Sequence, residues 1–106
     1  MIIDLKKLNK VKPIHFIGVG GCGMNPIAKT LFQLGYTISG SDFKPSTLSS
    51  YLIENGAQIT IGHHESTINS DIQLVVFSTA ISPLNCERIE AKRLNIPTVE
   101  RAIMRS

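Results

Sequence analysis

The sequence predicts an α/β protein: a Rossmann-like, doubly wound parallel sheet of about five strands with helices on both faces. Short apolar runs typical of buried strands alternate along the chain with segments whose apolar residues recur every three or four positions. A glycine-rich segment, 18–23, follows the first run and precedes the first helical segment. Alternating strands and helices imply parallel pairing through right-handed crossovers, which places helices on both faces of one sheet.

The length and composition fit one globular domain. The chain has 106 residues, of which 42% are hydrophobic and 18% charged. We expect a leader over residues 1–13 and the domain over 14–106. Four lysines fall in the first dozen positions and account for most of the net charge of +3, which predicts a solvated leader rather than a nucleic-acid interface.

The sequence shows no membrane span and no secretory signal. Its apolar runs are far shorter than the roughly 20 residues that cross a bilayer. The first residues have lysines but no continuous apolar region before a cleavage site. We therefore expect a cytoplasmic protein.

The first half of the domain is predicted to contain a strand, a glycine turn, a helix and a second strand, in that order. Residues 14–19 form an almost continuous apolar run, typical of a strand buried on both faces. Apolar residues then recur at helical spacing over 24–34, and Gly35 can end that helix. A second strand is expected at 37–40, closing at Ser41 and Asp42.

The second half continues the alternation. Capping residues and stop signals predict the following elements: a helix capped by Ser46 and ended at 55–56, a strand at 58–61, at most a short helix at 65–69, a strand at 74–77, a helix from Asn85 to Leu94, and a short strand at 98–99. Numbering the strands by sequence, we expect the spatial order 3-2-1-4-5. The ligand crevice would then lie between strands 1 and 4, where the winding reverses.

The glycine segment predicts a cradle for the diphosphate of a nucleotide-type ligand. Gly18, Gly20 and Gly23 have the spacing G-x-G-x-x-G, and Gly21 adds a fourth glycine. The spacing suits a tight turn, a close approach of backbone to phosphate, and a helix whose first N–H groups face the anion. Asp42 stands 19 residues after Gly23, where a carboxylate can bond a ribose or a base. Spacing alone leaves dinucleotides and sugar nucleotides open.

The residues around these glycines resemble the first domain of the Mur ligases of peptidoglycan synthesis, in particular those that add L-alanine to UDP-N-acetylmuramate. The matching segments are 14–24, 39–42, Gly62-His63, 78–81, Asn85 with Glu87, Ile96-Pro97 and Arg101-Ala102. The similarity covers about residues 14–104.

The resemblance implies that the domain holds the UDP part of UDP-N-acetylmuramate. The residues implied beside the diphosphate are Gly18, Gly20, Gly21, Cys22, Gly23 and Met24. Those implied near the uridine and on the opposite wall of the crevice are Ser41, Asp42, His63, Ser78, Thr79, Ala80 and Ile81.

The resemblance also implies which parts of the reaction lie elsewhere. The family joins L-alanine to the substrate carboxylate through an acyl phosphate made with ATP and Mg²⁺. The sequence contains no phosphate loop of the form G-x-x-x-x-G-K-[ST]. We therefore expect an amino-terminal domain or fragment that binds UDP-N-acetylmuramate but is inactive alone, with ATP and L-alanine held by further domains. No catalytic residue, metal or cofactor is expected in this domain.

Three alternatives stay open. The chain could be an NAD-binding domain of an oxidoreductase or redox sensor, the equivalent domain of the related ligase that recycles tripeptide, or a stand-alone fold that offers only a partner surface. The side chains outside the glycine motif are interpreted as structural: His15 as a histidine satisfied within the first strand, Cys86 as a reduced thiol, and Arg88, Lys92 and Arg93 as a solvated helix face.

Overall fold

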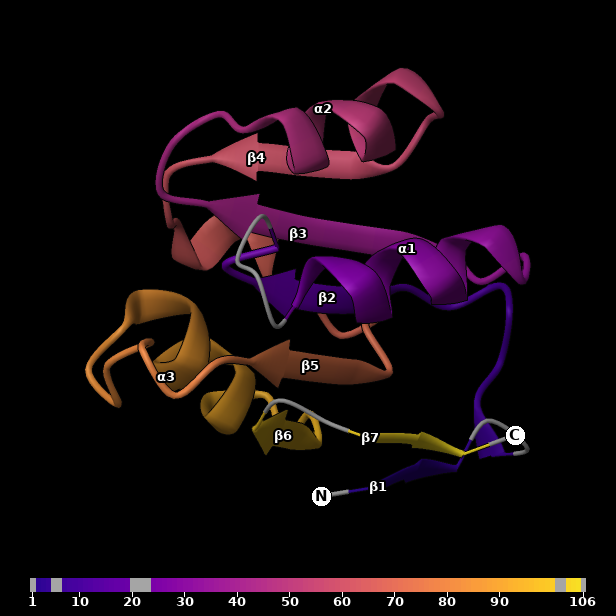
Figure 1. Cartoon of the computed structure of the whole chain (residues 1–106). Coiled ribbons are helices and arrows are strands. Elements are labelled where there is room, and N and C mark those ends of the chain that lie inside the picture. The colour runs from indigo at the N-terminus through magenta and orange to yellow at the C-terminus, as the bar shows by residue number, and fades with distance from the viewer. Residues whose placement is uncertain (1, 5–6, 20–23, 101–102, 106) are drawn as a thin grey trace.

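Five parallel strands form the central sheet of the computed structural model, which describes residues 2–4, 7–19, 24–100 and 103–105 (Figure 1). Their order across the sheet is β4-β3-β2-β5-β6, which confirms the predicted order. The strands are β2 (Ile14–Ile17), β3 (Ile38–Asp42), β4 (Gln58–Ile61), β5 (Leu74–Phe77) and β6 (Thr98–Glu100).

The central strand is β2. Ile14 pairs with Ile38 of β3 on one side and with Leu74 of β5 on the other. The chain adds β3 and β4 on the first side and then crosses to add β5 and β6 on the second. The winding therefore reverses between β2 and β5, at the predicted position of the ligand crevice.

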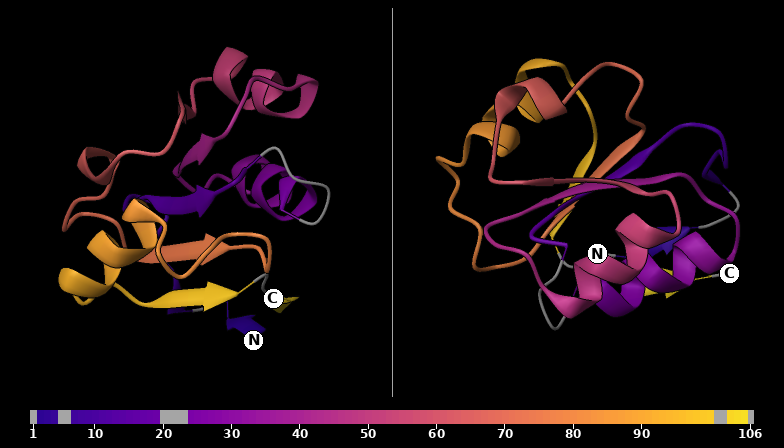
Figure 2. Two further views of the ribbon diagram at one scale, coloured as in Figure 1. Left: turned by 90° about the vertical axis from the view of Figure 1, so that its left-hand side faces the viewer. Right: turned by 90° about the horizontal axis from the view of Figure 1, so that it is seen from above.

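Helices cover both faces of the sheet (Figure 2). Helices α1 (Asn25–Gln33) and α2 (Thr47–Glu54) lie on one face. Helix α3 (Cys86–Arg93) and the short 3₁₀ helix η2 (Glu65–Thr67) lie on the other. Side chains alternate along β2: Phe16 packs in the core beneath α1 and α2, whereas Ile17 packs in the second core beneath α3.

The helix boundaries follow local chemistry that the sequence already displays. Ser46 and Ser49 form a reciprocal capping box at the start of α2, with two N–H···Oγ bonds of 3.1 Å. Asn85 caps α3 by accepting from the Glu87 N–H at 2.9 Å. Gly35, with φ +95°, follows α1 in the left-handed conformation that favours glycine. These three predictions are confirmed.

A second, two-stranded sheet was not predicted. Strand β1 (Ile2–Asp4) pairs in parallel with β7 (Ile103–Arg105) from the other end of the chain, so that the two strands lie side by side (Figure 1). The expectation of a merely solvated leader was therefore incomplete. Strands of three residues are too short to show an alternating pattern, and nothing local indicates a partner at the opposite end of the chain.

Gln73 joins the leader to the domain at a second place. Its Oε1 accepts from the Asn9 N–H at 2.9 Å, and its Nε2 donates to the Lys12 carbonyl at 2.8 Å. These bonds fix the approach of the chain to β2.

Candidate functional site

The segments named in the sequence analysis meet at the carboxyl edge of the sheet. The arrowheads of β3, β4 and β5 point to this edge in Figure 1. Gly18 follows β2 and donates its N–H to the Ser41 carbonyl at 2.8 Å. Gly62 follows β4 and donates its N–H to the Asp42 carbonyl at 2.7 Å. Backbone bonds therefore join the ends of three strands in one site.

Gly18, the first residue of the glycine turn, lies close to Ile81, one of the residues expected on the opposite wall. Gly18 has φ +80°, and a Cβ added there would lie 3.4 Å from Ile81 Cδ1. The implied diphosphate residues Gly20, Gly21, Cys22 and Gly23 lie outside the described residues. Met24 precedes α1, and its side chain is buried in the core, so only its backbone is placed to meet a ligand.

Helix α1 begins with a buried polar side chain, that of Asn25. Asn25 is 4% exposed, and among the described residues its Nδ2 has no hydrogen-bond acceptor. Buried donors are nearly always paired, because leaving one unpaired costs about 1–3 kcal/mol. The amide directly follows the glycine segment at a helix amino terminus, where an anion is favoured. Asn25 was not among the predicted site residues.

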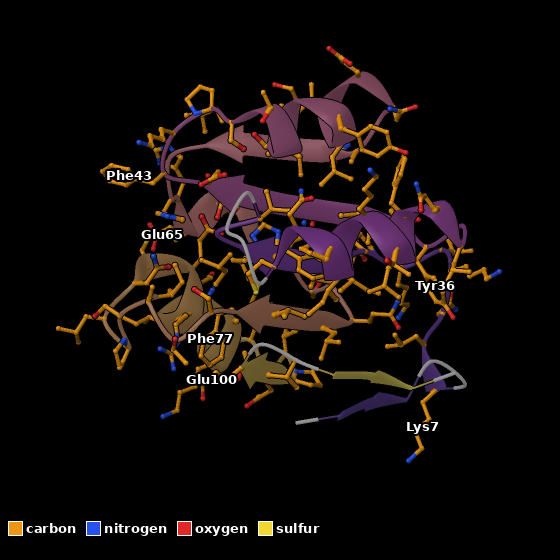
Figure 3. The ribbon with its side chains drawn as sticks, in the orientation of Figure 1. Lys7, Tyr36, Phe43, Glu65, Phe77 and Glu100 are labelled. Carbon is orange, nitrogen blue, oxygen red and sulfur yellow. The ribbon has the colours of Figure 1, made fainter. Side chains whose placement is uncertain are left out.

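Asp42 ends β3 at the edge of the site. Its side chain is half-buried, and its Oδ1 accepts from the Phe43 N–H at 2.8 Å. The Phe43 ring is 80% exposed and projects outward from this edge (Figure 3). The pair thus offers a carboxylate and an apolar ring to anything that binds here.

The opposite wall follows β5 and is anchored by α3. Ser78 and Ile81 are half-buried, whereas Thr79 and Ala80 are exposed. The Arg88 guanidinium lies 3.9 Å from the centre of the Phe77 ring, and its Nη1 donates to the Ile81 carbonyl at 2.9 Å. The interpretation of Arg88 as a solvated residue was therefore wrong, because its planar cation stacks on an aromatic ring.

A buried carboxylate lies between the sheet and α3. Glu87 is fully buried. Its Oε1 accepts from His15 Nε2 at 2.6 Å and from Ser41 Oγ at 2.9 Å, while its Oε2 accepts from the His64 N–H at 3.0 Å. Burial raises the pKa of the Glu87 carboxyl, but hydrogen bonding and electrostatic attraction to His15, with the bonds from Ser41 and His64, outweigh it and leave the pKa below its ordinary value.

Two further side chains extend this cluster. His15 Nδ1 lies 2.9 Å from Ser39 Oγ, so both ring nitrogens of His15 have partners and its interpretation as a satisfied structural histidine is confirmed. His63 Nδ1 lies 2.9 Å from Ser41 Oγ and 3.4 Å from the Glu87 Oε2. Ser41 is fully buried, so its hydroxyl serves this cluster.

Cavities also lie away from the glycine turn. One, of about 810 Å³, lies between α3 and the segment leading into β6 and is lined in part by Arg88, Lys92 and Arg93. Another, of about 280 Å³, is lined mostly by polar residues of β3, β4 and η2, together with His15 of β2. Over the described residues, no His, Cys, Asp and Glu side chains gather in a group that could hold a metal ion. No helix in the same part of the chain is long and apolar enough to cross a membrane.

One known protein family matches nearly the whole chain. The model described as the Mur ligase family, catalytic domain, matches residues 13–105. The chain belongs to the Mur ligase family. The match covers all five strands of the central sheet and the whole carboxyl edge.

Relatives within the Mur ligase family share about half of their aligned residues with this chain. It is 52% identical to the UDP-N-acetylmuramate--L-alanine ligase of Sulfurihydrogenibium sp. over 95 residues, which are 90% of this chain and 21% of the relative. It is 48% identical to the ligase of the same name from Buchnera aphidicola subsp. Baizongia pistaciae over 103 residues, or 96% and 21% of the two chains. The chain thus spans about a fifth of the length of these curated relatives.

Two solved ligases contain the same fold. The UDP-N-acetylmuramate-alanine ligase of Thermotoga maritima aligns with a TM-score of 0.80 at 30% identity, over 85% of this chain and 21% of that one. A second solved structure is the UDP-N-acetylmuramate:L-alanyl-gamma-D-glutamyl-meso-diaminopimelate ligase from Neisseria meningitides. It aligns with a TM-score of 0.74 at 23% identity, over 85% of this chain and 28% of that one. The second likeness concerns the fold alone.

Sequence reasoning about this Mur ligase domain missed the role of Glu87. Glu87 lies in the first turn of a helix, where an acid is usually explained by its favourable interaction with the helix dipole. That explanation requires no buried partner, so none was predicted. The available signal was His15, a titratable side chain in an otherwise apolar strand, which needs a hydrogen-bond partner when buried.

Proposed function

We propose that this chain is the domain of a Mur ligase that holds the UDP part of UDP-N-acetylmuramate. The observation that carries the proposal is the edge of the sheet at which Gly18, Asp42 and Ile81 converge, at the point where the winding reverses. Open α/β sheets bind nucleotides at that point. The names of the relatives support a UDP-sugar over a dinucleotide.

Each side of the site has a distinct role in this proposal. The backbone of 20–24 and the amide of Asn25 hold the diphosphate, because the Asn25 donor lacks an acceptor among the described residues. Asp42 and His63 face the uridine. Ser78, Thr79, Ala80 and Ile81 form the opposite wall. Ser41 acts indirectly, since its hydroxyl is bonded within the domain.

The domain contributes binding and not the chemical step. The sequence has no phosphate loop for ATP, so ATP, Mg²⁺ and L-alanine belong to other domains of a longer enzyme. That enzyme forms an acyl phosphate on the substrate carboxylate and transfers it to alanine, an ATP-dependent step of peptidoglycan synthesis in the cytoplasm. Holding the substrate in a fixed orientation is how this domain serves the reaction.

Calorimetric titration of the 106-residue chain tests the proposal. UDP-N-acetylmuramate should bind, and NADH should not. Asp42→Asn should weaken binding about ten-fold, the effect of losing one hydrogen bond to a charged group. Asp71→Asn is the matched control, because Asp71 is exposed and follows η2 outside the site. Binding of NADH without a response to UDP-N-acetylmuramate would replace the proposal with the dinucleotide alternative.

A further inference from the structure

Hydrogen-bond geometry around Glu87 determines where the hydrogen of His63 lies. A carboxylate only accepts, so the Ser41 hydroxyl, 2.9 Å from Glu87 Oε1, points its hydrogen at Glu87. The Ser41 oxygen is then the acceptor in its 2.9 Å contact with His63 Nδ1. His63 must therefore carry a hydrogen on Nδ1, and the 3.4 Å contact between Nδ1 and the Glu87 Oε2 favours the same arrangement.

The other ring nitrogen of His63 is left as an acceptor. A neutral imidazole carries one hydrogen, so a hydrogen on Nδ1 leaves a lone pair on Nε2. The described residues provide no partner for Nε2. In the described part of the chain, Asn25 Nδ2 is the only buried side-chain nitrogen or oxygen that lacks a hydrogen-bond partner. His63 Nε2 also lacks a partner among these residues, so it cannot be a buried atom and must be accessible to solvent. His63 directly follows Gly62, whose N–H donates to the Asp42 carbonyl at the carboxyl edge of the sheet.

We propose that Glu87 is a positioning residue that acts through Ser41 to present His63 Nε2 as an acceptor to the nucleoside part of the ligand. This role rests on the proposed function. Uridine carries donors that match it, the imide N–H of uracil and the ribose hydroxyls, whereas an ionised phosphate carries none. The lone pair on Nε2 therefore selects the nucleoside end of the ligand and repels the phosphates.

The first measurement requires no ligand. Long-range ¹H–¹⁵N spectra of the labelled chain at mildly alkaline pH report which nitrogen of each histidine carries the hydrogen, and His63→Gln assigns the signal. We expect the Nδ1–H form of His63 in the wild type. In Glu87→Gln a second, Nε2–H population should appear, because the amide no longer requires the Ser41 hydrogen. Glu90→Gln, one turn further along α3 and paired only with Arg93 among the described residues, should leave the spectrum unchanged.

The second measurement compares UDP with two analogues, one methylated at the imide nitrogen and one without ribose hydroxyls. We expect one analogue to bind the wild type about ten-fold more weakly than UDP, the effect of one lost hydrogen bond with an acceptor left unpaired. That ratio should fall towards one in Glu87→Gln and in His63→Gln. The analogue that loses affinity identifies the donor. If Glu87→Gln does not fold, as judged by circular dichroism, Ser41→Ala takes its place, because it removes the link between Glu87 and His63.

Three results would overturn the inference or its basis. An Nε2–H form of His63 in the wild type contradicts the hydrogen-bond assignment. Equal affinity of the wild type for UDP and both analogues contradicts the acceptor role. Failure of the wild type to bind UDP rejects the proposed function and the ligand role with it, and it is distinguishable because the tautomer is measured without ligand.

Discussion

Replacing Glu87 by glutamine should destabilise the domain by an amount that depends on pH. The carboxylate accepts from three donors, His15 Nε2, Ser41 Oγ and the His64 N–H, and the site is fully buried. A glutamine has one acceptor oxygen and brings two donors of its own, so at least one buried donor loses its acceptor. We expect a loss of about 3 kcal/mol at neutral pH, the upper end of the cost of leaving a buried donor without its acceptor.

The pH dependence follows from the lowered pKa of Glu87. The ordinary pKa of a glutamate carboxyl is about 4.5. At pH values just below it, Glu87 binds a proton in the unfolded state but not in the folded state. The stabilisation from Glu87 is therefore fully present above that value and is lost as the pH falls through the folded-state pKa. The difference between wild type and Glu87→Gln should shrink correspondingly in acid.

Urea unfolding followed by far-ultraviolet circular dichroism measures both effects, since the chain has no tryptophan to report on unfolding by fluorescence. At neutral pH the expected loss corresponds to a decrease in Tm of about 12 °C or more. Glu90→Gln is the control, because its ion pair with Arg93 is solvent-accessible and screened by salt. A Glu87→Gln domain as stable as the wild type, or a deficit that does not change in acid, would refute the reasoning.

Three further predictions concern stability. Gly40→Ala should cost about 1–3 kcal/mol, because its Cβ would lie 2.9 Å from the rigid Phe16 carbonyl oxygen; an unchanged urea midpoint would contradict this. Gln73→Ala should increase hydrogen exchange over residues 7–12, since it releases the leader; unchanged protection there would show that other contacts hold the segment. Asn85→Ala should lower the free energy of unfolding by about 1 kcal/mol through loss of the α3 cap, with a shift in urea midpoint as the measurement and no shift as the contrary result.

The strand order and the helix ends were predictable because their causes are local. An apolar run bounded by turn residues predicts a buried strand wherever it occurs, as Leu74 to Phe77 shows. Ser46 and Asn85 cap their helices through bonds to residues two or three positions away. Strand and helix alternation then restricts the topology to a few choices.

The Glu87 cluster was not predictable because its members meet only through the fold. His15 and Glu87 are separated by 72 positions in the sequence, and Ser41 and Glu87 by 46. Each residue has an ordinary local explanation, as a strand histidine, a strand-end serine or a first-turn acid. Their partnership depends on how α3 packs against the sheet, which no pattern in the sequence specifies. Arg88 was misinterpreted for the same reason.

Neighbouring side chains in the first turn of α3 reach two different sides of the crevice. Glu87 bonds to Ser41 and the backbone of His64 on the side of β3 and β4, whereas Arg88 bonds to the Ile81 carbonyl on the side of β5. The first turn of α3 therefore connects the segment that follows β5 to the ends of β3 and β4, across the point where the winding of the chain reverses. A shift of α3 would therefore disturb both segments at once, so one helical turn links the two parts of the proposed binding site mechanically.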